Sequence, residues 1–168
     1  MANSAKTNVK KNSSENFVKV LATNRSVRHN YEILEEFECG IALVGSEVKS
    51  LRTGGKLNLA DSYCRVIDGE AYLIGAHIAP YVHAIGFGRS EPDRRRKLLL
   101  HLKEIAKIKN EVERLHLTVV PLRVYFKGGL VKVEIALAKG KKTYDKRQAI
   151  TKRDQMREAA RDFKNVHR

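Results

Sequence analysis

Residues 119–138 read VVPLRVYFKGGLVKVEIALA and carry the clearest structural signal of the chain. Two apolar runs flank Lys127-Gly128-Gly129, a connection that is typical of a β-hairpin. In the second run every other residue is apolar: Val131, Val133, Ile135 and Leu137. Because successive side chains of a strand point to opposite faces, this spacing predicts a half-buried antiparallel strand with Lys132 and Glu134 outside.

The same period of two recurs at 31–38, and a second hairpin is predicted from 62–67 and 71–74 across Asp68-Gly69. Two helices interrupt the strands. A short one is predicted near 44–53, capped by Ser46 and stopped by Gly54. A longer one is predicted after Pro92-Asp93, with an apolar stripe at helical spacing: Leu98, Leu102, Ile105, Ile108, Val112 and Leu115.

Five or six short strands with one or two helices predict a mainly β fold. The closest match to this pattern is an OB-like antiparallel Greek-key barrel, which commonly serves as a nucleic-acid platform. A generic α+β sandwich is the alternative that the pattern leaves open.

The charge of the chain is high and uneven. Its 168 residues contain 33 Lys and Arg against 19 Asp and Glu, a net charge of +14 that favours a polyanionic partner. Residues 139–168 hold eleven Lys and Arg against four acidic residues, which is half of the net charge. We therefore expect a flexible basic arm at 1–23, a barrel at 24–138 and a basic tail at 139–168.

Motifs of known enzyme chemistry are missing from the sequence. It contains no phosphate-binding GxxxxGK[ST], no HExxH zinc motif and no GxSxG nucleophile. Cys39 and Cys64 form no CxxC pair and are expected to pack in the core. We predict no catalytic residue, no metal and no cofactor; an RNA-processing enzyme on the same barrel is the alternative function.

Basic residues interleave with aromatic ones at two places, as they do on RNA-contacting surfaces. The first comprises Arg25, Arg28, His29 and Tyr31. The second, at 138–147, combines several basic residues with Tyr144. A third basic cluster, Arg94-Arg95-Arg96-Lys97, is expected at the N-terminus of the longer helix, as a solvated face or a phosphate contact.

Several motifs, in order along the chain, resemble those of one known family. They are GSEVKSLR at 45–52, LADSY at 59–63, DGEAY at 68–72, RKLLLH at 96–101 and AKGKKTYDKR at 138–147. With these motifs, the stretch 24–168 resembles the SsrA-binding protein (small protein B) family, which binds bacterial transfer-messenger RNA. Residues 1–23 lie outside the resemblance.

The resemblance implies a non-enzymatic, cytoplasmic adaptor that binds the tRNA-like domain of transfer-messenger RNA. It delivers this RNA to the A site of stalled ribosomes for trans-translation, with elongation factor Tu on the aminoacylated RNA. The tail senses the empty mRNA channel near the decoding centre, where it meets small-subunit rRNA. A monomer without membrane association is expected; a membrane-surface protein is the rival, and the thin apolar face of the tail argues against it.

Matching residue by residue implies two sets of site residues. The set for the tRNA-like domain is Asn24, Glu38, Leu99, His101 and Lys132, beside Arg25, Arg28 and His29 from the pattern above. The ribosome-engaging set begins with Lys139, Gly140, Lys141, Lys142, Tyr144, Asp145, Lys146 and Arg147. Tyr144 stands where some members carry His, and Gly128-Gly129 stands where others often have Asn first.

The end of the tail has helical spacing. Arg153, Arg157 and Arg161 recur every four residues and form one basic stripe. Acidic partners three residues away add only about 0.2–0.5 kcal/mol each, so an isolated helix of this length is marginal in water. We expect 139–168 to be disordered when free and about 151–164 to become helical on the ribosome.

Overall fold

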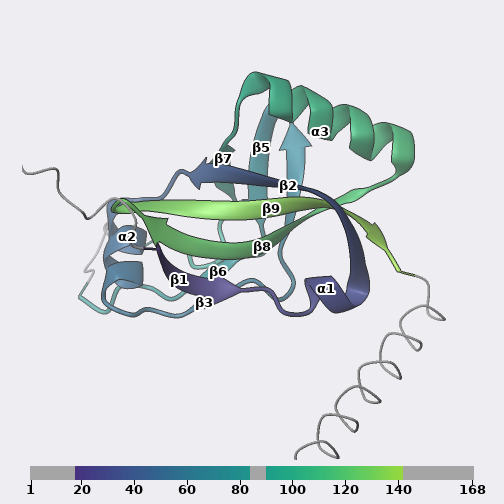
Figure 1. Cartoon of the computed structure of the whole chain (residues 1–168). Helices are drawn as coiled ribbons and strands as arrows, with labels where there is room; N and C mark the ends of the chain where they lie inside the picture. The colour runs from purple at the N-terminus through teal and green to yellow at the C-terminus, as the bar shows by residue number, and fades with distance from the viewer. Residues whose placement is uncertain (1–17, 84–89, 142–168) are drawn as a thin grey trace, which may run out of the picture.

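The computed structural model describes residues 18–83 and 90–141 (Figure 1). The strands are β1 (Val18–Thr23), β2 (Tyr31–Ile41), β3 (Leu57–Asn58), β4 (Tyr63–Ile67), β5 (Glu70–Ile74), β6 (His77–Ile78), β7 (Arg96–Leu99), β8 (Thr118–Lys127) and β9 (Leu130–Gly140). The helices are α1 (Val27–Asn30), α2 (Gly45–Arg52) and α3 (Leu102–Leu115).

Six strands close into an antiparallel barrel. The pairings run from β8 to β4, β5, β7, β2 and β9, and β9 pairs again with β8. Outside this ring, β1 pairs with the second half of β8, and β3 forms a small ladder with β6. The predicted class, a mainly β barrel with short helices, is confirmed, as are both predicted hairpins.

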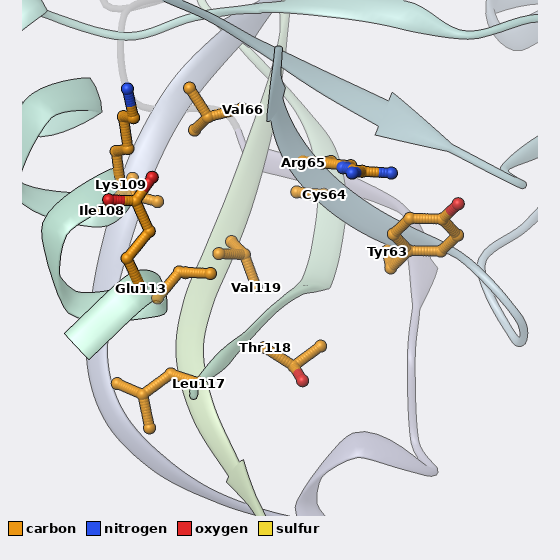
Figure 2. Close-up of a pocket in the computed structure, with 11 residues that line it drawn as sticks. Tyr63, Cys64, Arg65, Val66, Ile108, Lys109, Glu113, Leu117, Thr118 and Val119 are labelled. Carbon is orange, nitrogen blue, oxygen red and sulfur yellow. The ribbon is translucent and has the colours of Figure 1, made fainter. Parts of the chain in front are cut away.

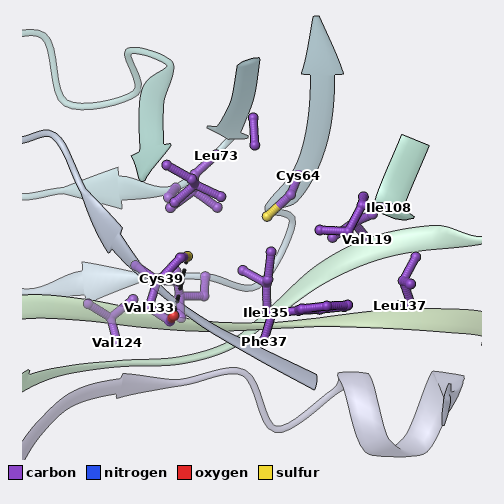
Figure 3. Close-up of a cluster of buried hydrophobic side chains, with 14 of the residues drawn as sticks. Phe37, Cys39, Cys64, Leu73, Ile108, Val119, Val124, Val133, Ile135 and Leu137 are labelled. Carbon is purple, nitrogen blue, oxygen red and sulfur yellow. Dashed lines mark hydrogen bonds between the residues drawn. The ribbon is translucent and has the colours of Figure 1, made fainter. Parts of the chain in front are cut away.

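One seam of the barrel is narrow and is covered by α3. β4 meets β8 at the single pair Cys64 and Val119. Ile108 of α3 is only 1% exposed and belongs to the same buried cluster as these two residues (Figure 3). The apolar stripe of the helix therefore completes the core where the strands leave a gap.

The predicted polar outer face of β9 exists only in its first half. Lys132 and Glu134 are on that face, but Ala136 and Ala138 follow them and are fully buried. These two alanines pack in a second apolar cluster with Val27, Val120 and Leu122. The start of α1 thus covers the far end of the sheet.

The longer helix starts later than the sequence predicts. Residues 96–99 form β7, in which Leu98 points into the barrel core, and α3 begins at Leu102. Leu98 fits a period of two as well as one of four, so spacing alone did not separate the strand from the helix. The cluster Arg94–Lys97 therefore does not lie at a helix N-terminus.

Instead, Arg96 is fully buried and pairs with Glu47 of α2. Its Nε donates to Glu47 Oε1 at 2.8 Å, and its other guanidinium nitrogens donate to three carbonyl oxygens, those of Ala76, Pro92 and Arg94. Arg94 also donates to both oxygens of Glu47. Glu47, rather than the predicted cap Ser46, accepts from the first amide of the turn, Val44 N–H, at 3.0 Å.

These contacts set the charge state of Glu47. Burial alone raises the pKa of its carboxyl, but the hydrogen bonds from Arg94 and Val44 and the charge of Arg96 outweigh burial and hold the pKa below its ordinary value. The carboxylate is therefore charged in the folded protein at neutral pH.

Both predicted boundaries of the barrel shift. β1, at 18–23, falls in the region expected to be a flexible arm, yet it pairs with β8 from Val18 to Thr23. At the other end β9 continues through Gly140, and the amide of Lys141 donates to Asn30 O at 3.0 Å. The folded part of the chain therefore includes residues assigned by sequence to both appendages. Residues 1–17 and 142–168 lie outside the described residues.

Both cysteines are buried and free, as predicted. Cys39 Sγ donates to Val133 O at 3.4 Å, and burial raises the pKa of this thiol to about 12. Burial also raises the pKa of Cys64 well above its usual range. Both thiols are therefore neutral at neutral pH.

We predict that Glu47→Gln destabilises the barrel strongly, because it leaves the buried Arg96 guanidinium without its counter-charge. The expected loss is about 3–5 kcal/mol in the free energy of unfolding, measured by urea denaturation. Glu111→Gln is the matched control, since Glu111 pairs with Arg114 on an exposed face of α3. That pair contributes about 0.5 kcal/mol or less.

The same measurement at low pH tests the charge assignment. A carboxyl whose pKa is lower in the folded state stabilises the fold above its ordinary value of about 4.5, and this contribution is lost as the pH falls through the folded value. The difference between wild type and Glu47→Gln should therefore shrink below about pH 4.5. A difference that is constant down to pH 3 would contradict a charged Glu47.

Candidate nucleic-acid interface

Three of the predicted RNA-binding residues meet on one outer face of the barrel. Leu99 of β7 pairs with Gly40 of β2, Gly40 pairs with Lys132 of β9, and Lys132 pairs with Tyr125 of β8. Glu38 lies two residues before Gly40 on the same face of β2. We call this set, Glu38, Leu99, Tyr125 and Lys132, the cross-strand row.

Leu99 is placed on this row by a close contact with Gly40. It is 56% exposed although it is a large apolar residue. A Cβ built on Gly40 would lie 3.3 Å from two carbon atoms of Leu99, so the side chain of Leu99 lies across the glycine. The absence of a side chain at Gly40 thus lets an apolar surface sit next to Lys132.

Lys132 is the cation of the row. Within the described residues no carboxylate lies within ion-pair distance of its amine. The neighbouring Glu134 is engaged by Arg123, whose Nε donates to it at 2.6 Å. An ammonium group without an internal partner is suited to a phosphate oxygen.

Glu38 is held by two donors from β8. The hydroxyl of Tyr125 donates to Oε2, and Nζ of Lys127 lies 3.0 and 2.9 Å from the two oxygens. The Tyr125 hydrogen bond and then the Lys127 contacts lower the pKa of Glu38. Burial and the bond to Glu38 raise the pKa of Tyr125. The row therefore presents a fixed carboxylate at neutral pH.

His101 lies just beyond the row, at the start of α3. It is exposed, and its backbone amide donates to Glu104 Oε2 at 2.8 Å. It follows Leu99 by two residues, so the end of β7 and the start of α3 bring both of them to the same edge of the barrel.

Asn24 does not join this surface. It is 7% exposed; its Nδ2 donates to Leu59 O at 2.8 Å, and its Oδ1 accepts from Ser26 at 2.7 Å. The side chain links the turn after β1 to the loop before β4. Its place in the structure is that of a support for the turn that carries Arg25.

A second basic group lies at the other end of the barrel, where β9 ends beside α1 (Figure 1). Arg25 and Arg28 are exposed, and His29 Nδ1 lies 3.0 Å from Asn30 Oδ1. Nζ of Lys141 donates to Arg28 O at 3.1 Å. Lys139 and Gly140 are also exposed here, about nine residues or 30 Å of strand from Gly40.

The remaining predicted tail residues lie outside the described residues: Lys142, Tyr144, Asp145, Lys146, Arg147, Arg153, Arg157 and Arg161. The described chain ends at Lys141, whose contacts with Arg28 and Asn30 join this second basic group to the first tail residues.

Sequence reasoning missed Tyr125 and Lys127, although a signal was present. Arg123 and Tyr125 lie two residues apart in the predicted strand 119–126, and Lys127, predicted as the first residue of the connection, continues the same period in β8. A period of two places them on one face. The links of Tyr125 and Lys127 to Glu38, 87 and 89 residues away, could not be predicted from spacing.

A pocket of about 330 Å³ lies beside the narrow seam, between α3, β4 and the start of β8 (Figure 2). Its walls are largely apolar and include Val66, Ile108 and Val119, while Lys109 and Glu113 lie at α3. The thiol of Cys64 in this pocket is not ionised, because burial raises its pKa. We find no activated nucleophile among the described residues that line the pocket.

Membrane-spanning helices and metal clusters are both absent from residues 18–83 and 90–141. In those ranges no helix has the length and apolar character needed to cross a bilayer. There, too, no three His, Cys, Asp or Glu side chains gather closely enough to hold a metal ion.

Comparison with known proteins gives one consistent result. The model of the family described as SmpB protein matches residues 21–165. The chain is 56% identical over 146 residues to the SsrA-binding protein of Sulfurihydrogenibium sp. (strain YO3AOP1), covering 87% of this chain and 95% of that protein. It is 54% identical over 145 residues to the SsrA-binding protein of Solidesulfovibrio magneticus, covering 86% and 93%.

A solved structure agrees with these sequence matches. It is described as "tmRNA-SmpB: a journey to the center of the bacterial ribosome" and is 49% identical to this chain. It superposes with a TM-score of 0.59 over 73% of this chain and 85% of its own. Matches of this extent leave one assignment: the chain belongs to the SmpB family of SsrA-binding proteins.

Proposed function

We propose that the protein is a non-enzymatic adaptor that binds the tRNA-like domain of transfer-messenger RNA and brings it to stalled ribosomes for trans-translation. The observation that carries this proposal is the cross-strand row. It combines an exposed leucine, a lysine without an internal partner and a fixed carboxylate on one rigid barrel face. The names of the relatives, and the transfer-messenger RNA and ribosome named for the solved structure, support the same partners.

In this proposal the second basic group faces the ribosome. Arg25, Arg28 and Lys139 lie where the tail leaves the barrel, roughly one strand length from the row. A protein with the cross-strand row and the second basic group at opposite ends of β2 can hold one RNA on the barrel while its tail follows another. In this proposal the tail enters the empty mRNA channel and approaches the decoding centre, with elongation factor Tu on the aminoacylated RNA and one adaptor molecule per RNA.

We predict a steep salt dependence for binding to transfer-messenger RNA. If the barrel neutralises about four to six phosphates, the log–log slope of affinity against salt is about −3 to −4. Lys132→Ala should reduce the size of this slope by about one. Lys109→Ala, an equal change of charge on exposed α3, is the control and should leave the slope unchanged. Equal slopes for wild type and Lys132→Ala would remove Lys132 from the interface.

We predict that the barrel and the tail separate functionally. The predicted end of the barrel is Ala138, but β9 continues to Gly140, and the backbone amide of Lys141 donates a hydrogen bond to Asn30 O. The truncated protein should therefore keep its residues up to Lys141. A protein truncated after Lys141 should keep its affinity for transfer-messenger RNA and lose rescue of stalled ribosomes. A loss of affinity of more than about 100-fold, roughly 2.7 kcal/mol, would contradict this division.

A proline in the tail tests its proposed helix at 151–164. Proline in a helix interior costs about 3 kcal/mol and leaves the charge unchanged. Ala159→Pro should therefore abolish rescue in a reconstituted translation assay and spare binding of transfer-messenger RNA. Ala159→Ser, which allows a helical backbone, is the control. Full rescue by Ala159→Pro would mean that the tail acts as a flexible polycation.

A further inference from the structure

Two glutamates of the barrel are held in the same way. Glu38 accepts hydrogen bonds from Tyr125 and Lys127, and Glu70 accepts them from Tyr72 and Lys97. The two carboxylates are similarly exposed, at 39% and 42% of their side chains. The two triads differ in their place on the barrel: the first lies on the cross-strand row, and the second joins β5 to β7.

The hydrogen bonds of Glu38 leave one acceptor position on a defined atom. A carboxylate has about four lone-pair positions. Oε2 accepts from Tyr125 and Lys127, whereas Oε1 accepts from Lys127 alone among the described residues. Oε1 can therefore take one more donor from outside the protein.

The charges around Glu38 restrict what that donor can be. Two lysines lie near Glu38: Lys127, which is already bound to it, and Lys132 on the neighbouring strand. Glu134, which pairs with Glu38 across the two strands, is neutralised by Arg123. A phosphate oxygen offers no proton and is repelled by a carboxylate. In an RNA the groups that can donate here are a ribose 2′-hydroxyl or an amino or imino N–H of a base.

Tyr125 acts on this contact only through Glu38. It is 4% exposed, so its hydroxyl is not accessible to an RNA, and it bonds to the oxygen that is already full. Arg123 packs over its ring at 5.3 Å from the centroid, which further fixes the phenol. The tyrosine thus occupies Oε2 and leaves Oε1 as the oxygen with a free acceptor position.

We propose that Glu38 Oε1 accepts one hydrogen bond from a 2′-hydroxyl or base N–H of the bound RNA, and that Tyr125 is the positioning residue for this contact. This inference rests on the proposed function. It assigns the acidic residue of the row to recognition of a neutral donor, while Lys132 serves the phosphates.

The test is a double-mutant cycle on binding to transfer-messenger RNA. A hydrogen bond to a charged group predicts a loss of about 10- to 100-fold in affinity for Glu38→Ala, which removes both acceptor oxygens, and we expect about 3- to 10-fold for Tyr125→Phe. The double variant should bind within about twofold of Glu38→Ala, because Tyr125 has no role once the acceptor it positions is gone. Tyr72→Phe, from the matched triad, should bind like wild type.

The outcomes separate this inference from the proposed function. If the wild-type protein does not bind transfer-messenger RNA, the proposed function fails. If it binds but Glu38→Ala is within about twofold of wild type, or the losses of the two variants add fully, the inference alone is overturned. Thermal unfolding of each variant checks that the barrel is intact.

A second measurement reports on positioning directly. NMR titration of the Glu38 carboxyl should show its pKa rising in Tyr125→Phe, because the largest lowering contact is removed. RNAs with single 2′-deoxy substitutions then identify the donor. If one substitution weakens binding by wild type but not by Glu38→Ala, the donor is that 2′-hydroxyl. If none does, base analogues that lack an amino group, such as inosine for guanosine, should weaken wild type but not Glu38→Ala. If neither series contains a substitution with this selective effect, the proposal is overturned.

Discussion

The buried pair between Arg96 and Glu47 anchors β7, the shortest of the six strands that close the barrel. β7 has only four residues, and it pairs with β2 at just two positions. An anchor outside the ladders therefore adds to the few backbone pairs that hold this strand between β5 and β2. Arg96 supplies the anchor by joining β7 to α2 and to three backbone carbonyls, and each of its polar atoms has a partner. A buried charge without these partners would destabilise the fold, so the network also fixes a single arrangement.

The cross-strand row depends on the position of β7. Leu99 is the last residue of β7, and its contact with Gly40 exists only because β7 lies against β2. From Gly40 the register passes to Lys132 and Tyr125 through ladders that are long and apolar on their inner side. The hairpin of β8 and β9 therefore sets the positions of Lys132 and Tyr125. The ion pair between Arg96 and Glu47 holds β7 and thereby sets the position of Leu99.

The positions of the strands and hairpins could largely be predicted from the sequence, but the residues at which these elements begin and end could not. The period of two fixed β8 and β9, and Asp68-Gly69 fixed the turn between β4 and β5. Leu98 was assigned to a helix because its spacing suits both structures. β1 was missed because Val18–Thr23 is stabilised by pairing with β8, a partner about a hundred residues away, rather than by its own pattern.

The candidate site shows the same division. The residue types and family motifs named Glu38, Leu99 and Lys132, and charge arithmetic indicated a polyanionic partner. Local spacing cannot report that Tyr125 donates to Glu38, that Asn24 is buried, or that Arg28 meets Lys141, because each contact joins segments far apart in the chain. Period and composition are local properties, which the sequence contains directly. Strand register and burial arise from the closed barrel as a whole, so only the folded chain defines them.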